Sequence, residues 1–181
     1  MYNLKELQSD FQKGKKLKYL FFWGHQPSKD GSITKSVFSQ WWIGHPFTEN
    51  GIAYKSAEHY MMAGKARLFE DEEHLSLILN CESPAEAKKL GRKVRNFDPQ
   101  RWEAHRSDIV TQANYLKFGQ HEELKSFLLG TQNRIIVEAS PRDRIWGIGM
   151  GKNNPSALYP DQWRGQNLLG FCLMEARDRL R

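Results

Sequence analysis

The stretch Tyr54–Phe69, which reads YKSAEHYMMAGKARLF, constrains the fold most, because its apolar residues fit a helix and not a strand. The run Tyr60–Ala63 lacks the alternation that buries one face of a strand, whereas a helix lying across a core can bury it. Ser56 has a side chain preferred at a helix N-cap, and Glu58 places a negative charge in the first turn. We therefore predict a central helix here, around which the rest of the chain is arranged.

Three residues of this helix, Glu58, Met62 and Lys65, fall at positions i, i+4 and i+7 and so share one stripe of its surface. Seven helical residues rise about 10 Å, which is roughly the length of a nucleoside. Glu58 and Lys65 could therefore stand at opposite ends of a pocket. The alternative is a surface helix whose two charged side chains are merely solvated, and the spacing alone leaves both interpretations open.

The chain has 181 residues, which is enough for one domain with a substantial core. No apolar run is long enough to cross a bilayer, and the N-terminus lacks the apolar segment of a secretory signal, so we expect a cytoplasmic protein without a membrane partner. Cys81 and Cys172 match neither a disulfide framework nor a zinc site, and the six histidines lack metal-binding spacings. We expect neither a metal nor another cofactor.

The net charge of +6 favours an anionic ligand, for example a phosphorylated nucleotide. The basic residues are spread along the chain and form no single block, so the signal for nucleic-acid binding is weak. Several of the six tryptophans sit beside Gly, His, Arg or Asp. Such residues could line a slot for a flat ring, although the edge of an amphipathic core would have the same composition.

The remaining pattern predicts a mostly helical chain with few strands. Further helices are predicted at residues 2–13, 70–79, 83–95, 98–118, 122–129 and 167–180. Residues 18–23 and 37–43 are predicted strands that could pair as a hairpin, and residues 134–139 form the clearest strand. The segment Glu49–Gly51 is a predicted turn that leads into the central helix.

A glycine-rich loop, Trp146–Gly151 (WGIGMG), follows the strand at 134–139. It lacks the third glycine spacing of a dinucleotide-binding fingerprint, and no helix opens directly behind it, which argues against a Rossmann fold. Such a turn can still present backbone N–H groups to a phosphate. An ordinary tight loop would have the same sequence.

Asp143 and Trp146 lie just past this strand, where loops commonly carry function. Glu58 and Asp143 together could orient a water molecule and protonate a leaving group, which is what hydrolysis of a glycosidic bond requires. Lys65 could instead act as an amine nucleophile on an aldehydic sugar carbon. Glu138 alternates with apolar strand residues and could face either way. Without a fold, the sequence does not bring these groups together.

Several segments, in the same order along residues 19–180, resemble the NADAR/YbiA-like family. They are FFWGH (21–25), YKSAEHYMMAGKARLF (54–69), SPAEAKKLGRKV (83–94), Trp102 with Arg106, YLKF (115–118), LLGT (128–131), VEASPRDRIWGIG (137–149), WRGQNLLG (163–170) and LMEAR (173–177). One departure concerns the first strands, where many members carry a Ser-Asn-Phe block and this chain has FFWGH and a later SQWW (39–42). We interpret it as a subgroup variant in the wall that selects the base or substrate.

The resemblance implies a compact α+β fold, mostly helical with a small β-sheet, in which residues 1–18 are an N-terminal helical extension of a domain at 19–181. It also implies an N-glycosidase that removes a nitrogenous base or amine from C1 of a ribose without a metal. Its substrates would be ribosylamino-pyrimidine phosphates of riboflavin synthesis or ADP-ribosylated guanine, the latter in nucleotides or nucleic acid. No obligate protein partner is implied. The alternatives are a non-catalytic module that binds ADP-ribose or nucleotides, and a non-specific RNA-binding protein.

The resemblance also assigns roles to residues. Glu58 would be the catalytic carboxylate and Asp143 the second acidic group, while Lys65 would polarise the ribose or form a transient Schiff base with its opened form. Trp102 and Trp146 would stack on the base or enclose it, and Trp23, Gly24 and His25 would form the opposite wall. Gly147 and Gly149 would bring backbone donors near phosphate or ribose. Arg92 and Asn167 would also bind substrate, although an arginine on a helix surface and an asparagine at an N-cap also have structural explanations.

Overall fold

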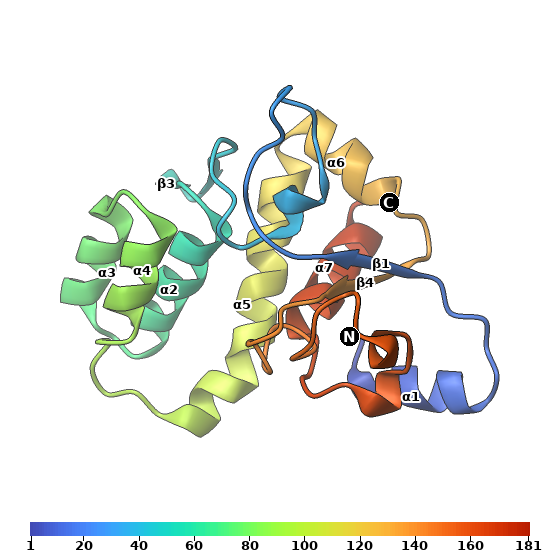
Figure 1. Cartoon of the computed structure of the whole chain (residues 1–181). Coiled ribbons are helices and arrows are strands. Elements are labelled where there is room, and N and C mark those ends of the chain that lie inside the picture. Colours follow the sequence, from blue (N-terminus) through green and yellow to red (C-terminus); the bar gives the residue numbers. More distant parts are fainter.

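Seven α-helices dominate the regular secondary structure of the computed structural model, which describes residues 1–181 (Figure 1). The helices are α1 (Leu4–Gln12), α2 (Ala57–Leu68), α3 (Glu72–Asn80), α4 (Pro84–Gly91), α5 (Pro99–Gly119), α6 (Glu122–Leu129) and α7 (Leu168–Arg179). The strands are β1 (Tyr19–Phe22), β2 (Phe47–Glu49), β3 (Ile52–Tyr54) and β4 (Ile135–Glu138), and short 3-10 helices span Lys35–Phe38 (η1), Pro155–Leu158 (η2) and Pro160–Gln162 (η3). The expected α+β, mostly helical class is confirmed.

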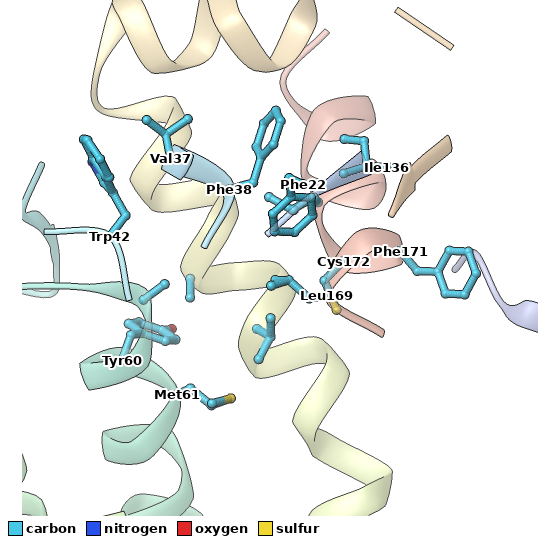
Figure 2. Close-up of a cluster of buried hydrophobic side chains, with 14 of the residues drawn as sticks. Phe22, Val37, Phe38, Trp42, Tyr60, Met61, Ile136, Leu169, Phe171 and Cys172 are labelled. Atoms are coloured by element: carbon cyan, nitrogen blue, oxygen red, sulfur yellow. The ribbon is translucent and has the colours of Figure 1, made fainter. Parts of the chain in front are cut away.

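The long helix α5 runs through the middle of the molecule and connects its two sides (Figure 1). It packs against α2 on one side and against α7 on the other. Helices α2, α3 and α4 lie together on the left of Figure 1, and β1, β4 and α7 lie on the right. Figure 2 shows the buried side chains that join the two sides, among them Met61 from α2, Phe38 from η1 and Leu169 from α7.

The central helix forms as predicted, as α2 at Ala57–Leu68. Its N-cap is Ser56, whose hydroxyl accepts a hydrogen bond from the backbone N–H of His59 at 3.3 Å. Eight of its residues are buried, so the helix is covered by protein on most sides and is not the solvated surface helix of the alternative interpretation. The predicted helices at 98–118 and 167–180 are likewise found as α5 and α7.

The predicted hairpin between residues 18–23 and 37–43 is wrong. Strand β1 pairs in parallel with β4, with Tyr19 opposite Ile135 and Phe22 opposite Glu138. Residues 35–38 instead form η1, and Val37 and Phe38 are both fully buried. Because a strand points successive side chains to opposite faces, a half-buried strand could not bury both neighbours.

One side chain from α5 and one backbone N–H from α2 replace the partners that a strand ladder would have given this segment. The ammonium group of Lys117 donates to the carbonyl oxygens of Val37, at 2.5 Å, and Ser39, at 3.0 Å. The carbonyl of Gln40 accepts the backbone N–H of Glu58 at 2.9 Å. The segment is thereby held against the start of α2.

The predicted turn at Glu49–Gly51 is the loop of a two-stranded antiparallel hairpin, β2–β3, which the sequence prediction missed. Asn50 and Gly51 have φ angles of 51° and 79°. Asn-Gly with two positive φ angles is the preferred loop of a tight hairpin.

The predicted helix at 83–95 is too long, because α4 ends at Gly91. Two interactions hold the chain that follows away from a helical path. The carbonyl of Gly91 accepts a hydrogen bond from Lys65 at 2.8 Å, and the backbone N–H of Arg95 donates to Asp71 at 2.8 Å. A Cβ atom at Gly91 would fall 2.0 Å from the sulfur of Met62, so the glycine lets α4 lie close to α2.

The predicted N-terminal helix is found as α1, which packs on η3 through Phe11 and Tyr159 and through a hydrogen bond from Gln8 to the carbonyl of Pro160. The separation of residues 1–18 from a domain at 19–181 stays a prediction. None of the helices combines the length and the apolar character required to cross a bilayer.

Candidate active site

A cavity of about 400 Å³ lies where the start of α2, the end of α4, the ends of β1 and β4 and the loop after β4 meet. Nine of the twelve residues predicted for the site line it. They come from four separate parts of the sequence, residues 23–25, 58–65, 92–102 and 143–146. The volume falls within the usual range of small-molecule sites.

Helix α2 supplies one wall of the cavity through the predicted stripe of Glu58, Met62 and Lys65. Glu58 lies in the first turn and is only 3% exposed. Its Oε1 atom is buried and accepts no hydrogen bond. A buried carboxyl group without a full set of partners costs stability, so such a group in the lining of a cavity is typical of a functional residue.

Burial raises the pKa of Glu58 to about 7, because desolvation disfavours the charged form. The positive charge of Lys88 and the nearby Trp41 indole act against this shift, and the negative charge of Asp143 adds to it. Glu58 therefore titrates near neutral pH, the range in which a carboxyl group can either take up or give up a proton.

Lys65 stands one helical turn beyond Met62, and its ammonium group lies close to two aromatic rings and donates to the carbonyl of Gly91. The Nζ atom lies 4.1 Å from the ring centre of Phe97 and 5.7 Å from that of Trp102. Burial lowers the pKa of the Lys65 ammonium. A lysine with a lowered pKa is a better amine nucleophile than an exposed one.

The loop after β4 forms the facing wall and is shaped by Asp143. Its Oδ1 atom accepts the backbone N–H groups of Ile145, at 2.8 Å, and Trp146, at 2.7 Å. Its own backbone N–H donates to the hydroxyl of Ser140 at 3.3 Å. Asp143 and Trp146 both line the cavity, and one carboxylate oxygen of Asp143 is occupied in holding the Trp146 backbone in place.

The segment after β1 brings Trp23, Gly24 and His25 to the mouth of the cavity. Trp23 is 68% exposed, which leaves most of its ring available to a ligand. The ring of His25 lies 5.5 Å from that of Trp41, a cavity-lining residue that the prediction did not assign to the site. Arg92, at the C-cap of α4, also lines the cavity and is exposed.

Gly147, Gly149 and Asn167 do not line the cavity, and the structure gives them packing positions behind its wall. The side chain of Asn167 is fully buried, accepts the backbone N–H of Glu138 at 2.9 Å and donates to the carbonyl of Ile136 at 3.0 Å. It makes no side-chain cap for α7. A Cβ atom at Gly147 would lie 2.8 Å from the carbonyl oxygen of Glu138, so this glycine lets the loop lie against β4. Gly149 has a φ of 68°, a backbone conformation that a residue with a side chain would adopt only with strain.

The sequence prediction did not assign three charged or aromatic lining residues to the site, namely Glu138, Trp41 and Lys88. Glu138 alternates with the apolar residues of the predicted strand at 134–139, and alternation alone does not settle which way its side chain points. Lys88 lies 5.7 Å from the ring of Trp41. Together with Arg92 it places positive charge at a cavity whose interior holds three carboxyl groups, those of Glu58, Glu138 and Asp143.

The fold and the cavity define an α+β domain with a desolvated carboxyl group between aromatic walls and basic side chains. The chain belongs to the NADAR domain family, whose model matches residues 21–181. It is 44% identical over 169 residues to N-glycosidase R617 of Acanthamoeba polyphaga mimivirus, which covers 89% of this chain and 95% of that protein. It is 32% identical over 145 residues to N-glycosidase YbiA of Escherichia coli strain K12, which covers 80% of this chain and 79% of that protein.

The fold matches the NMR structure of the Escherichia coli protein YbiA with a TM-score of 0.68 and 28% sequence identity, over 91% of this chain and 87% of that chain. The resemblance to the NADAR/YbiA-like family is therefore confirmed. The relatives' names support the expectation of a hydrolase that acts on N-glycosyl bonds.

Proposed function

We propose that the protein is an N-glycosidase that hydrolyses the C–N bond between C1 of a ribose or phosphoribose and a nitrogenous base or amine. The observation that carries the proposal is Glu58, a carboxyl group 3% exposed with an unpartnered oxygen, which lines a cavity of about 400 Å³. Glycoside hydrolysis needs a carboxyl group beside the breaking bond, and the family membership supports this chemistry.

We assign the catalytic roles to three residues. Glu58 is the principal carboxyl group at C1 of the ribose. Asp143 is the second acidic group, and its Oδ2 atom, which accepts no hydrogen bond from the protein, stabilises positive charge that develops on the sugar. Lys65 polarises the ribose, or attacks C1 of its opened form as an amine, because it is partly desolvated beside Phe97 and Trp102.

The walls of the cavity suit a flat base and a phosphate. Trp102 and Trp146 enclose the base from the interior, and Trp23, Gly24 and His25 cover it at the mouth. Lys88 and Arg92 attract the phosphate groups. Gly147, Gly149 and Asn167 act indirectly, since they hold the loop that carries Trp146 against β4.

Two substrate classes fit this description, ribosylamino-pyrimidine phosphates of riboflavin synthesis and ADP-ribosylated guanine. Both have a ribose C1 bonded to nitrogen and both carry phosphate. Nucleic acid enters as the carrier of an ADP-ribosylated guanine, and a cytoplasmic location suits either substrate.

The decisive experiment is to incubate the purified protein with members of both substrate classes and to follow the released base or amine by mass spectrometry. We expect release from one class, and no release by the Glu58→Gln variant. Tight binding in calorimetry without any product over hours would instead support a module that binds ADP-ribose without turnover. Affinity for unmodified RNA that collapses with salt would point to non-specific electrostatic binding.

A second experiment separates the two roles of Lys65. If the amine forms a Schiff base, borohydride added during turnover reduces it to a stable secondary amine, whose mass is that of the protein plus the sugar product, less one water and plus two hydrogens. Lys65→Ala should abolish both the adduct and base release. Loss of activity without any adduct in the wild-type protein would assign Lys65 an electrostatic role.

A further inference from the structure

Two carboxyl groups with the same unusual environment reach the cavity from different elements. Glu58 comes from the first turn of α2, and Glu138 is the last residue of β4. Both line the cavity, and each has one buried side-chain oxygen that accepts no hydrogen bond, Oε1 of Glu58 and Oε2 of Glu138. They are the only carboxyl groups in the chain with such an oxygen.

The backbone of Glu138 is held on both sides, while its carboxyl group is left free. Its N–H donates to Oδ1 of Asn167 and its carbonyl accepts the N–H of Ile148, each at 2.9 Å. The position of the residue is therefore fixed by the fold without any contribution from its side chain. A purely structural residue here would not need a carboxyl group, and burying one without partners is costly.

The charges around the pair favour different protonation states in the two groups. Burial raises the pKa of Glu138 to about 8, and the negative charges of Asp143 and Glu58 add to the shift while Lys88 opposes it. The pKa of Glu58 is raised to about 7. Among the neighbouring charges, Lys88 acts most strongly on Glu58 and favours its carboxylate form, whereas Asp143 acts most strongly on Glu138 and favours its protonated form.

We propose that Glu138 is a second catalytic carboxyl group, which donates a proton to the leaving nitrogen, while Glu58 acts as the carboxylate that accepts a proton from the attacking water. This inference rests on the proposed N-glycosidase function. It assigns the proton transfer to two residues that line one cavity from different elements, and it leaves Asp143 to shape the loop and stabilise charge.

The step balances as a simple hydrolysis. The C1–N bond breaks with its electron pair remaining on nitrogen, and the nitrogen takes the proton of the Glu138 carboxylic acid. A water oxygen forms the new bond to C1 and gives its proton to the Glu58 carboxylate. The products are the free base or amine and a sugar with a hydroxyl group at C1, and a proton exchanged between the two carboxyl groups through solvent restores the starting state.

The first test compares pH–rate profiles of base release for the wild-type protein, Glu138→Gln and Glu58→Gln. We expect Glu138→Gln to lower the rate at least about 100-fold, the usual contribution of a positioned proton donor. Its residual activity should lose the alkaline limb of the profile, because that limb reports the loss of the proton from Glu138. Glu58→Gln should lose the acidic limb instead.

The second test does not depend on turnover. The side-chain carboxyl carbons of glutamate are labelled with ¹³C and titrated by NMR in the free protein. Two signals should titrate near neutral pH, and in Glu58→Gln the remaining signal should move to lower pH because the neighbouring negative charge is gone.

The matched control is Glu49→Gln. Glu49 is a half-buried glutamate outside the cavity, with hydrogen bonds to Tyr60 at 2.7 Å and Gln112 at 2.9 Å, and the variant should keep wild-type rates and both limbs. The proposal for Glu138 is overturned if Glu138→Gln retains activity within about threefold with its alkaline limb intact, or if Glu138 titrates in the ordinary range of glutamate. If the wild-type protein releases no base from either substrate class, the proposed function itself fails, whatever the titration gives.

Discussion

Two buried carboxyl groups stand at opposite ends of α2, and they differ in what surrounds them. Glu58, at the start of the helix, is 3% exposed, and Asp71, just beyond its end, is 2% exposed. Asp71 accepts hydrogen bonds from the backbone and the guanidinium group of Arg95, each at 2.8 Å, and caps α3 through the backbone N–H of His74 at 3.2 Å. Oε1 of Glu58 accepts none.

The partners decide what each acid does. The Arg95 guanidinium bound to Asp71 holds the pKa of that carboxyl well below its usual range, so Asp71 stays charged and ties α3 to the chain after α4. Burial without such a partner moves the pKa of Glu58 in the opposite direction, to about 7. Burial alone thus does not mark a functional acid, whereas burial without partners beside a cavity does.

The largest expected effect is on catalysis. Replacing Glu58 by Gln should lower the rate of base release at least about 100-fold, because a neutral amide can neither accept nor donate the required proton. The unfolding midpoint should stay the same or rise, since the desolvated carboxyl is replaced by a neutral group of the same shape. The rates are measured by mass spectrometry and the midpoint by thermal unfolding followed by circular dichroism. A full rate in a contaminant-free preparation would contradict the role of Glu58.

The next effect is the pH dependence of stability. The pKa of Glu58 is about 7 in the folded protein against a reference value of 4.5, so between these values the folded state binds more protons than the unfolded state. The free energy of unfolding contributed by this group therefore falls as the pH rises through that window. Between about pH 5 and pH 7 the Glu58→Gln variant should gain about 2 kcal/mol over the wild-type protein. Urea unfolding of both proteins at several pH values measures the difference, and parallel profiles would mean that Glu58 is not desolvated.

Substitution of Asp71 should lower the stability of the fold, and the pH dependence of its contribution should have the opposite sign to that of Glu58. Asp71→Ala removes both the charge that binds Arg95 and the cap of α3, so it should lower the unfolding midpoint by several degrees. Asp71→Asn is the matched variant that keeps a capping oxygen and loses only the charge, and it should lose less. Because the pKa of Asp71 is lowered in the fold, the contribution of the wild-type side chain is present above the ordinary aspartate range and disappears as the pH falls below it. Equal unfolding midpoints for Asp71→Ala and the wild-type protein would show that Asp71 does not stabilise the fold.

The smallest effect is expected for an acidic residue that has an ion-pair partner but is exposed to solvent. Glu82 pairs with Lys55 at 2.8 Å, but its side chain is 86% exposed. Exposed pairs contribute little, because water solvates the separated charges almost as well. Glu82→Gln should therefore leave both the unfolding midpoint and the rate of base release unchanged within error. A drop comparable with that of Asp71→Ala would show that the ion pair matters without burial.

Much of the local structure and part of the site were predictable from spacing alone. The apolar cluster at residues 60–63 and the cap at Ser56 predicted α2, and the i, i+4, i+7 spacing placed Glu58, Met62 and Lys65 on the side of the helix that faces the cavity. These features are local, because helix geometry fixes which side chains share a face regardless of the rest of the chain.

The parallel pairing of β1 with β4 was not predictable in this way. The two strands are separated by more than a hundred residues, and no local pattern specifies a partner at that distance. The same holds for residues 37–43, whose backbone is held by Lys117 of α5 and not by a neighbouring strand.

The sequence by itself determined the approximate positions of the helices, the cap of α2 at Ser56 and the face of α2 that carries Glu58, because these depend on residues a few positions apart. Only the tertiary structure decided that Glu138 faces the same cavity, that Gly147 and Gly149 stand behind its wall, and that Asp71 is paired while Glu58 is not. The physical reason is that desolvation and hydrogen-bond partners come from segments far apart in the chain, so the charge state of a buried acid depends on how the elements pack.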